Sequence, residues 1–275
     1  MTILSLFDGI SCGQLATQRI HLGYDRYMAS EIDPGAIKVT QSNFPETVQL
    51  GDVNLVSAAG LPKVDLLLGG SPCQGFSSIG VGLGLEDPRS KLFYEFVRVL
   101  DECKPTHFLL ENVPMRQKWE DIITEAVGVD PIEINSSLVS AQNRVRLYWT
   151  NIEGVQPPDD RGITLDNVVE DPGEYRIPGN WQRYVPDTMP RFVDPYNRCE
   201  VAGGKSTSLR TNVNNGNMWI RTPSGDYRNL TVSECEKLQT VPVGYTSVAS
   251  PAQAKKMLGN GWTVDVIAHI LSYLQ

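Results

Sequence analysis

The chain begins with TILSLFDGISCGQLATQRIHLG (residues 2–23), in which a short apolar run enters a glycine-bearing turn and then a helical stretch that Gly23 closes. A second apolar run, RYMASEI (26–32), follows at once. The alternation continues to about residue 150, with further strand-like runs at VDLLLGG (64–70) and THFLLENV (106–113). This pattern is typical of βαβ units, so the sequence predicts an α/β fold with a mostly parallel sheet.

Helical patterns flank this region and return near the end of the chain. In SKLFYEFVRVLDEC (90–103), one apolar stripe recurs at helical spacing, formed by Phe93, Phe96, Val97 and Leu100. TVSECEKLQTVP (231–242) has the helix-capping candidates Thr231 and Ser233. Residues 250–274 predict two helices that are broken at Gly259–Gly261.

The composition changes after residue 150. Residues 151–227 are rich in proline and contain the polar segment NVNNGN, and no part of them predicts a convincing helix. We therefore expect a small, loop-rich domain at 151–227, and a main domain formed by residues 1–150 together with 228–275.

Composition limits the function classes. The 275 residues contain three histidines and five cysteines without paired spacing (Cys12, Cys73, Cys103, Cys199 and Cys235), so we expect no metal site and reduced thiols. The sequence has no apolar run of membrane-spanning length and no signal-peptide pattern, and we expect a cytoplasmic protein without a membrane partner.

The net charge of −8 is unevenly distributed. Residues 1–141 hold 10 basic and 18 acidic side chains, whereas residues 175–225 hold 7 basic and 3 acidic ones. Because phosphate contacts need lysine and arginine, the second segment is the better candidate for a polyanionic partner. Ordinary solvated surface charge is an equally good explanation of this pattern alone.

The turn FDGISCG (7–13) opens a helix after the first strand and predicts a ligand site, because backbone N–H groups are exposed at such a turn. It lacks the GxGxxG pattern of dinucleotide enzymes. Glu31 ends the second strand, where a carboxylate can accept hydrogen bonds from ribose, and Asp52 is placed to meet an adenine edge. Together they indicate an adenosine-bearing cofactor with few phosphates, although each could be a surface acid.

LLLGGSPCQGFSSIG (66–80) places Cys73 at a turn after a buried strand. A lone cysteine is most often an inert core residue, but the turn would expose this thiol. A nucleophilic thiol needs nearby positive charge, which Arg144 and Arg146 could supply. If residues 142–146 form a strand, Gln142 and both arginines share one face. Glu111 and Asn112 end a strand, where open α/β sheets place ligands.

These stretches resemble motifs of the cytosine-C5 DNA methyltransferases. LFDGISCG is similar to the family's first cofactor motif, SPCQGFSSIG to its Pro-Cys-Gln loop, ENV (111–113) to its Glu-Asn-Val motif and QNRVR (142–146) to its Gln-x-Arg-x-Arg. RNLTVSECEKLQTVP (228–242) resembles the ninth motif and GNG (259–261) the last. The resemblance covers nearly the whole chain except about 151–227, and it implies a Rossmann-like class I methyltransferase fold with a smaller target-recognition domain.

The resemblance implies an S-adenosyl-L-methionine-dependent enzyme that methylates C5 of a flipped cytosine in duplex DNA. Cys73 would attack C6 of the base and Glu111 would bind its N3 and amine, while Arg144 and Arg146 would hold the nucleophile loop and the base. The implied cofactor-binding residues are Phe7, Asp8, Gly9, Ile10, Glu31, Ile32, Asp52, Val53, Pro72, Leu92 and Asn260. The implied substrate-binding residues are Gln74, Ser77, Ser78, Asn112, Gln142, Lys205, Arg210 and Arg221.

Three alternatives stay open. An RNA cytosine methyltransferase would use the same motifs, but the Cys-Phe-Thr signature of that branch is not found here. A catalytically dead DNA-binding paralogue is disfavoured by intact Cys73, Glu111 and Asn260, and an NAD-dependent oxidoreductase by the missing GxGxxG. We further expect a stand-alone phage or bacterial enzyme of DNA methylation or restriction-modification, without an obligatory protein partner, and a lid at residues 78–90.

Overall fold

A computed structural model describes residues 1–71, 91–170, 185, 191–201, 203–211 and 217–275. It divides into two compact units. Unit 1 comprises residues 1–134, 145–157 and 266–275, and unit 2 comprises residues 135–144 and 158–265.

Unit 1 is built on a seven-stranded sheet in the order β3-β2-β1-β4-β5-β7-β6. Strands β1, β2, β4 and β5 run parallel with β3, and β7 is antiparallel to β5. The mostly parallel sheet confirms the predicted α/β class. The strands are β1 (Thr2–Leu6), β2 (Arg26–Ser30), β3 (Val48–Gln49), β4 (Leu66–Gly69), β5 (His107–Asn112), β6 (Pro131–Asn135) and β7 (Val145–Thr150).

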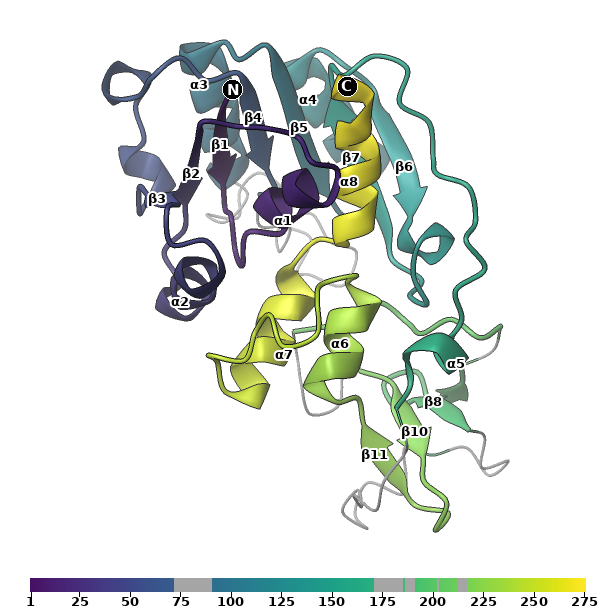
Figure 1. Cartoon of the computed structure of the whole chain (residues 1–275). Helices are drawn as coiled ribbons and strands as arrows, with labels where there is room; N and C mark the ends of the chain where they lie inside the picture. The colour runs from purple at the N-terminus through teal and green to yellow at the C-terminus, as the bar shows by residue number, and fades with distance from the viewer. Residues whose placement is uncertain (72–90, 171–184, 186–190, 202, 212–216) are drawn as a thin grey trace. The chain divides into compact units, whose positions relative to one another are not determined.

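Helices cover both faces of this sheet, with α1 and α8 on the near face and α3 and α4 behind it in Figure 1. Asp33 caps α2, since its Oδ1 accepts hydrogen bonds from the backbone N–H groups of Gly35 and Ala36. The bounds are α1 (Cys12–Arg19), α2 (Pro34–Asn43), α3 (Lys91–Cys103), α4 (Gln117–Val127) and α8 (Val264–Leu271).

The end of β4 needs a glycine. A Cβ atom on Gly69 would lie 2.5 Å from Cδ2 of Phe96 in α3, a fully buried ring of the main core. Helix α3 therefore packs directly over the last residue of β4, just before the turn that leads to the predicted nucleophile. The pair Gly69 and Phe96 fixes where that turn begins.

Unit 2 contains a four-stranded antiparallel sheet in the order β11-β10-β8-β9. Its small core is formed by Val193, Trp219 and Tyr227. The strands are β8 (Phe192–Asp194), β9 (Cys199–Glu200), β10 (Trp219–Arg221) and β11 (Tyr227–Asn229), and the helices are α5 (Leu165–Val168), α6 (Val232–Leu238) and α7 (Pro251–Asn260).

The expectation that 151–227 contains no helix was wrong at α5. This single turn forms because the Thr164 N–H donates to Oδ1 of Asn167 at 2.8 Å, while Leu165 and Val168 bury their side chains. The short strands agree with the rest of that expectation.

The compact division also differs from the domain boundaries expected from sequence, because α6 and α7 group with the small sheet rather than with residues 1–150. A buried ion pair explains part of this grouping: Arg228 of β11 binds both carboxylate oxygens of Glu234 in α6, at 2.7 and 2.8 Å. Which stretch recognises the target therefore stays a prediction.

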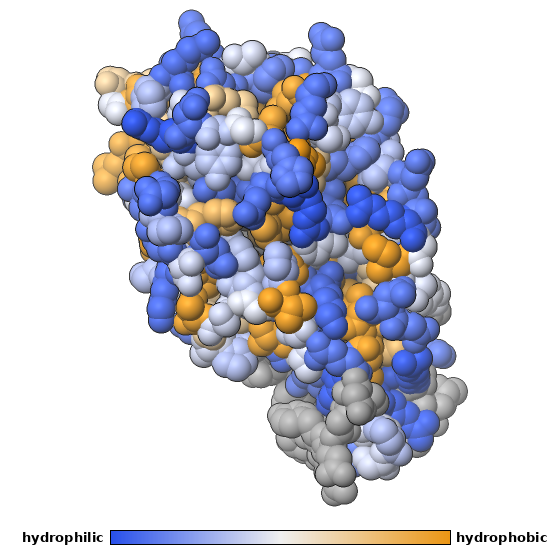
Figure 2. Space-filling model, viewed as in Figure 1, coloured by the Kyte–Doolittle hydropathy of each residue, from blue (hydrophilic) through white to orange (hydrophobic). Residues whose placement is uncertain are grey.

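No helix among the described residues combines the length and apolarity that a membrane span requires. On the face drawn in Figure 2, apolar residues form small, separate patches among hydrophilic ones.

Candidate functional site

The turn after β1 adopts an unusual backbone. Phe7, Gly9 and Ser11 all lie in the left-handed region, with φ of 56°, 60° and 57°. Glycine adopts this conformation freely, but Phe7 and Ser11 do so at a cost. Backbone hydrogen bonds hold the turn: the Asp8 N–H donates to the Ser30 carbonyl, and the Ser11 N–H donates to the Asp8 carbonyl, each at 3.1 Å.

Glu31 ties this turn to the end of β2. Its Oε2 accepts the Gly9 N–H at 2.8 Å, and its Oε1 accepts the N–H groups of Ile32 and Asp33 at 2.7 and 2.8 Å. The carboxylate is thereby fixed at the carboxyl edge of the sheet. A carboxylate oxygen accepts two hydrogen bonds, so Oε2 retains capacity for a ribose hydroxyl.

Asp8 turns its carboxyl group into the protein. Tyr27 of β2 donates its hydroxyl to Oδ1 at 3.0 Å, and Ser11 donates to Oδ2. Burial raises the pKa of Asp8 from 3.8 to about 6, against the lowering effect of the hydroxyls of Ser11, Ser5 and Tyr27, and the charge of Glu31 raises the pKa further.

Asp52 lies beyond the end of the neighbouring strand β3, where its side chain caps the short turn Val53–Leu55. The Ser30 hydroxyl donates to the Gly51 carbonyl at 2.7 Å, which ties the end of β2 to the segment before Asp52. Two apolar side chains project beside these acids: Ile32 is 70% exposed and Leu55 80% exposed. Exposed apolar side chains next to carboxylates suit a flat, partly apolar base attached to a sugar. These acceptor groups and apolar side chains fit the adenosine part of S-adenosylmethionine.

The other predicted cofactor residues differ in accessibility. Ile10 is 1% exposed and Val53 is 5% exposed, so only their backbone groups could face a ligand. Phe7 and Leu92 pack partly buried against the main core of unit 1. Asn260 is exposed at the last position of α7, in unit 2.

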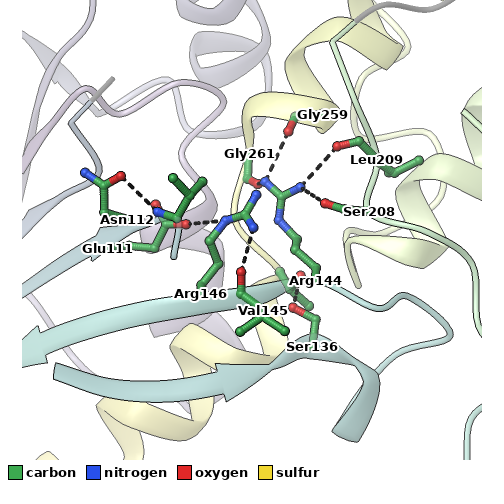
Figure 3. Close-up of polar contacts among 12 residues, drawn as sticks. Glu111, Asn112, Ser136, Arg144, Val145, Arg146, Ser208, Leu209, Gly259 and Gly261 are labelled. Carbon is green, nitrogen blue, oxygen red and sulfur yellow. Dashed lines mark hydrogen bonds and ion pairs between the residues drawn. The ribbon is translucent and has the colours of Figure 1, made fainter. Parts of the chain in front are cut away.

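At the end of β5, Glu111 pairs with Arg146 of β7. Arg146 Nε donates to Glu111 Oε1 at 2.9 Å, and the two side chains are only 14% and 11% exposed. Figure 3 shows the guanidinium turned toward Glu111, with a second bond from Nη1 to the Val145 carbonyl. Low exposure strengthens such a pair and holds the carboxylate in one orientation.

Asn112 connects this pair to the predicted nucleophile turn. Its Nδ2 lies 3.2 Å from Oγ of Ser71, and its Oδ1 accepts the Val113 N–H at 2.9 Å. Asn112 is buried, so its predicted contact with substrate would require the site to open; its observed partner is the turn. The predicted residues Pro72, Cys73, Gln74, Ser77 and Ser78, and the predicted lid at 78–90, lie outside the described residues.

Arg144 has a different environment, within unit 2. Its Nη1 donates to Ser208 Oγ and the Leu209 carbonyl at 3.1 and 3.2 Å, and its Nη2 donates to the carbonyls of Gly259 and Gly261 at 3.1 and 2.9 Å (Figure 3). The residue is 3% exposed. Arg144 therefore joins the 206–211 segment to the GNG turn that carries Asn260.

The glycine of this turn is required by close packing. A Cβ atom on Gly259 would lie 2.7 Å from the Arg210 carbonyl oxygen, a backbone atom that cannot move aside cheaply. The GNG stretch is thus a packing motif as well as a predicted cofactor motif.

Gln142 is fully buried in the same unit. Its Nε2 donates to the Leu238 carbonyl at 3.0 Å, and its Oε1 accepts the Leu209 N–H at 2.7 Å. The prediction that Gln142, Arg144 and Arg146 share one strand face was wrong, because β7 begins at Val145. Gln142 instead forms an isolated parallel bridge with Ser206.

Three basic residues are predicted to contact substrate, and they differ in accessibility: Lys205, Arg210 and Arg221. Lys205 Nζ donates to the carbonyls of Ser137, Ser140 and Ile163 at 2.6–3.2 Å, so it holds unit 2 together. Arg210 is partly exposed, pairs with buried Asp194 at 3.4 Å and lies over the Tyr196 ring at 4.6 Å. Arg221 is exposed at the end of β10. Arg210 and Arg221 are thus more accessible than Lys205.

Sequence reasoning missed two residues that shape the site, Tyr27 and Ser71. Tyr27 was visible as a hydroxyl-bearing side chain inside an otherwise apolar strand. Ser71 gave no comparable signal, because serine is common in turns.

A family comparison covers most of the chain. Residues 1–122 and 180–275 match the family described as C-5 cytosine-specific DNA methylase. The orphan methyltransferase M.SPRI of Bacillus phage SPR is 36% identical over 165 residues, covering 55% of this chain and 38% of the relative. The type II methyltransferase M1.ScrFI of Lactococcus lactis subsp. cremoris is 27% identical over 301 residues, covering 96% and 75%. The chain thus spans less than half of the phage relative.

Solved structures share the fold. Spodoptera frugiperda DNMT2, in a triple-mutant form, gives a TM-score of 0.74 at 20% identity and covers 99% of both chains. A putative DNA modification methyltransferase encoded within an E. coli prophage gives 0.67 at 22% identity, covering 100% and 98%. Together with the family match over more than half of its residues, these results show that the chain belongs to the C-5 cytosine-specific DNA methylase family.

Proposed function

We propose that this protein is a DNA (cytosine-5-)-methyltransferase that acts on a flipped cytosine in duplex DNA through a covalent bond between Cys73 and C6. The observation that supports it most is the arrangement at the end of β5. Glu111 is oriented by Arg146, and the next residue, Asn112, holds Ser71, two positions before Cys73. An acid and a nucleophile turn are therefore tied to adjacent parallel strands, β5 and β4.

The proposed reaction balances as follows. The Cys73 thiolate adds to C6 of cytosine, and the electron pair of the C5–C6 double bond moves to make C5 nucleophilic. C5 takes the methyl group, the C5 proton passes to a base, and the electron pair of the C5–H bond restores the double bond as the thiolate leaves. Extrusion of the base is required because the ring atoms are not accessible to such attack inside a stacked duplex.

Glu111 would bind the N3 and amine edge of the base and stabilise the charge that develops there during attack at C6. Its orientation matters because a preorganised polar group costs no rearrangement during the reaction. Arg146 would act as the positioning residue for Glu111. Arg144 would act at a distance, by holding the GNG turn within unit 2.

S-adenosylmethionine, when bound, would supply the methyl group from its sulfonium; the S–CH3 bond breaks and its electron pair stays on sulfur, which leaves S-adenosylhomocysteine. Glu31 would hold the ribose, Asp52 would meet the adenine edge, and Ile32 and Leu55 would cover the base. The glycine turn would approach the cofactor through its backbone, because the Asp8 side chain points inward.

Residues within 151–227 would recognise duplex DNA, with Arg210 and Arg221 among the cationic groups that are more accessible than Lys205. Lys205 is assigned a supporting role, since three carbonyls accept from its ammonium group. We propose action in the cytoplasm of a bacterium or of a phage-infected cell, in DNA methylation of the orphan or restriction-modification kind.

The test is to trap the proposed adduct. Duplex DNA containing 5-fluorocytosine should give a covalent complex only with S-adenosylmethionine, because the fluorine at C5 cannot leave as a proton does. Cys73→Ser should abolish the complex. Trapping of RNA alone would contradict the choice of substrate, and full methylation by Cys73→Ser would contradict the mechanism.

A further inference from the structure

The carboxyl group of Asp8, in the glycine turn at residues 7–13, takes no part in the proposed methyl transfer. Asp8 is a partly buried acid that receives hydrogen bonds from two hydroxyls on different elements, Tyr27 within β2 and Ser11 at the start of α1. Withdrawing a carboxylate from solvent is costly, because the charged form loses hydration. The nearest charged neighbour of Asp8 among the groups that affect its pKa is Glu31, another anion.

The Ser11 hydroxyl also connects the turn to α2. Thr40 of α2 lies 3.3 Å from Ser11 Oγ and 3.4 Å from the Gly9 carbonyl oxygen. Gly9 is also the residue whose N–H donates to Glu31. A chain of contacts therefore runs from Tyr27 through Asp8 and Ser11 to the groups that face the proposed cofactor.

We propose that Tyr27 and Ser11 are positioning residues for cofactor binding, which hold the ionised Asp8 carboxylate beneath the glycine turn and so keep Gly9 aligned with Glu31. The inference rests on the proposed function. It adds residues and a pH dependence that the mechanism itself does not require.

The protonation state of the Asp8 carboxyl group determines how the glycine turn is held. The carboxylate accepts from both hydroxyls, whereas the protonated acid carries a donor on one oxygen, and that oxygen can no longer face a hydroxyl proton in the same way. Because burial raises the pKa of Asp8 to about 6, this change falls within an accessible pH range. Cofactor affinity should then be full above pH 6 and decline as pH falls through that region.

Each substitution has a distinct signature. Tyr27→Phe removes a hydrogen bond that favours the charged form, so the pH midpoint of cofactor binding should move upward by about one unit, and affinity at pH 7 should fall about twofold. Asp8→Asn cannot ionise and should lose this pH dependence. Tyr24→Phe is the matched control, because it removes a nearby tyrosine hydroxyl whose described partner is Gln14 rather than Asp8.

The experiment is calorimetric titration of the full chain with S-adenosylhomocysteine from pH 5 to 8, with a thermal melt of each variant. An upward shift of the midpoint in Tyr27→Phe, a flat profile in Asp8→Asn and a wild-type profile in Tyr24→Phe would support the inference. If Tyr27→Phe is unfolded, Ser11→Gly gives the same test, since glycine suits the left-handed backbone at this position.

An unchanged midpoint in Tyr27→Phe, or a persistent wild-type profile in Asp8→Asn, would overturn the positioning role while cofactor binding itself stands. Failure of the wild-type chain to bind S-adenosylhomocysteine would instead overturn the proposed function, and the inference with it.

Discussion

Arg144 and Arg146 are two positions apart in the sequence, but they serve different parts of the molecule. Arg146, in unit 1, orients the carboxylate of Glu111 at the end of β5. Arg144, in unit 2, donates to four neutral oxygens from two separate segments. One motif thus contains a residue that orients a proposed catalytic group and a residue that stabilises the fold. Substituting Arg146 should mainly lower activity, and substituting Arg144 should mainly lower stability.

The largest effect is expected at Glu111. Glu111→Gln keeps the size of the side chain but removes the acid, so kcat for methylation should fall by about 10³-fold, the range of general acid or electrostatic groups. Affinity for S-adenosylhomocysteine should be unchanged. Steady-state kinetics on duplex DNA measures the first value, and a loss of less than tenfold would remove Glu111 from the mechanism.

Arg144→Met should mainly affect stability. It leaves carbonyls of buried segments without their donor, so the free energy of unfolding should fall by about 3 kcal/mol. Urea denaturation followed by tryptophan fluorescence measures this loss. Wild-type stability combined with lost activity would show that Arg144 takes part in the reaction, and would contradict the difference proposed between Arg144 and Arg146.

Arg146→Met should show the opposite profile. The pair with Glu111 has low exposure, so removing its donor should lower stability by about 2 kcal/mol, whereas kcat should fall about 10²-fold because Glu111 loses its orientation. The measurements are those used for Arg144→Met. A double substitution with Glu111→Gln should be no worse in kcat than Glu111→Gln alone, because the residues act as a unit.

Asp8→Asn should make the protein more stable at neutral pH. Burial raises the pKa of Asp8 from 3.8 to about 6 in the folded protein. The unfolded chain therefore ionises first, and stability is lost as pH rises from about 3.8 to about 6, with no further loss above that range. Removing the charge should raise the unfolding free energy by about 2 kcal/mol at pH 8, with little difference at pH 4. Chemical denaturation at both pH values tests this. Destabilisation that is equal at pH 4 and pH 8 would contradict it.

The smallest effect is expected at Arg221. Arg221→Ala should weaken DNA binding a few-fold and reduce the dependence of log affinity on log salt by about 0.9, as for one phosphate contact. Lys205→Met is the comparison, since it should lower stability without changing that slope. Fluorescence anisotropy at several salt concentrations distinguishes them, and an unchanged slope in Arg221→Ala would exclude this phosphate contact.

The sequence predicted the sheet and its class because apolar runs and glycine turns follow directly from strand burial. It failed at the Gln-x-Arg-x-Arg stretch, where alternation requires a strand but β7 begins only at Val145. Side-chain direction at 142–144 is decided by distant segments, such as the Leu209 N–H that Gln142 accepts. For the same reason, the division of labour between Arg144 and Arg146 could not be predicted from their spacing.

The proposed cofactor region shows what a strand pattern can and cannot predict. Glu31 directly follows β2, as expected, whereas Asp52 lies beyond the end of β3 at Gln49 instead of at the strand end. The inward direction of Asp8 was not expected, because it depends on Tyr27 and Ser11, which come from elements on either side of the turn.

The central claim is that the chain methylates cytosine at C5 in DNA through Cys73. Bisulfite sequencing of DNA from cells that express the wild-type chain or Cys73→Ser tests this claim most directly. If the proposed activity is correct, protected cytosines should occur in a fixed sequence context with the wild-type chain, and none should occur with Cys73→Ser. Equal protection by both proteins, or no protection by an expressed and folded wild-type chain, would contradict it.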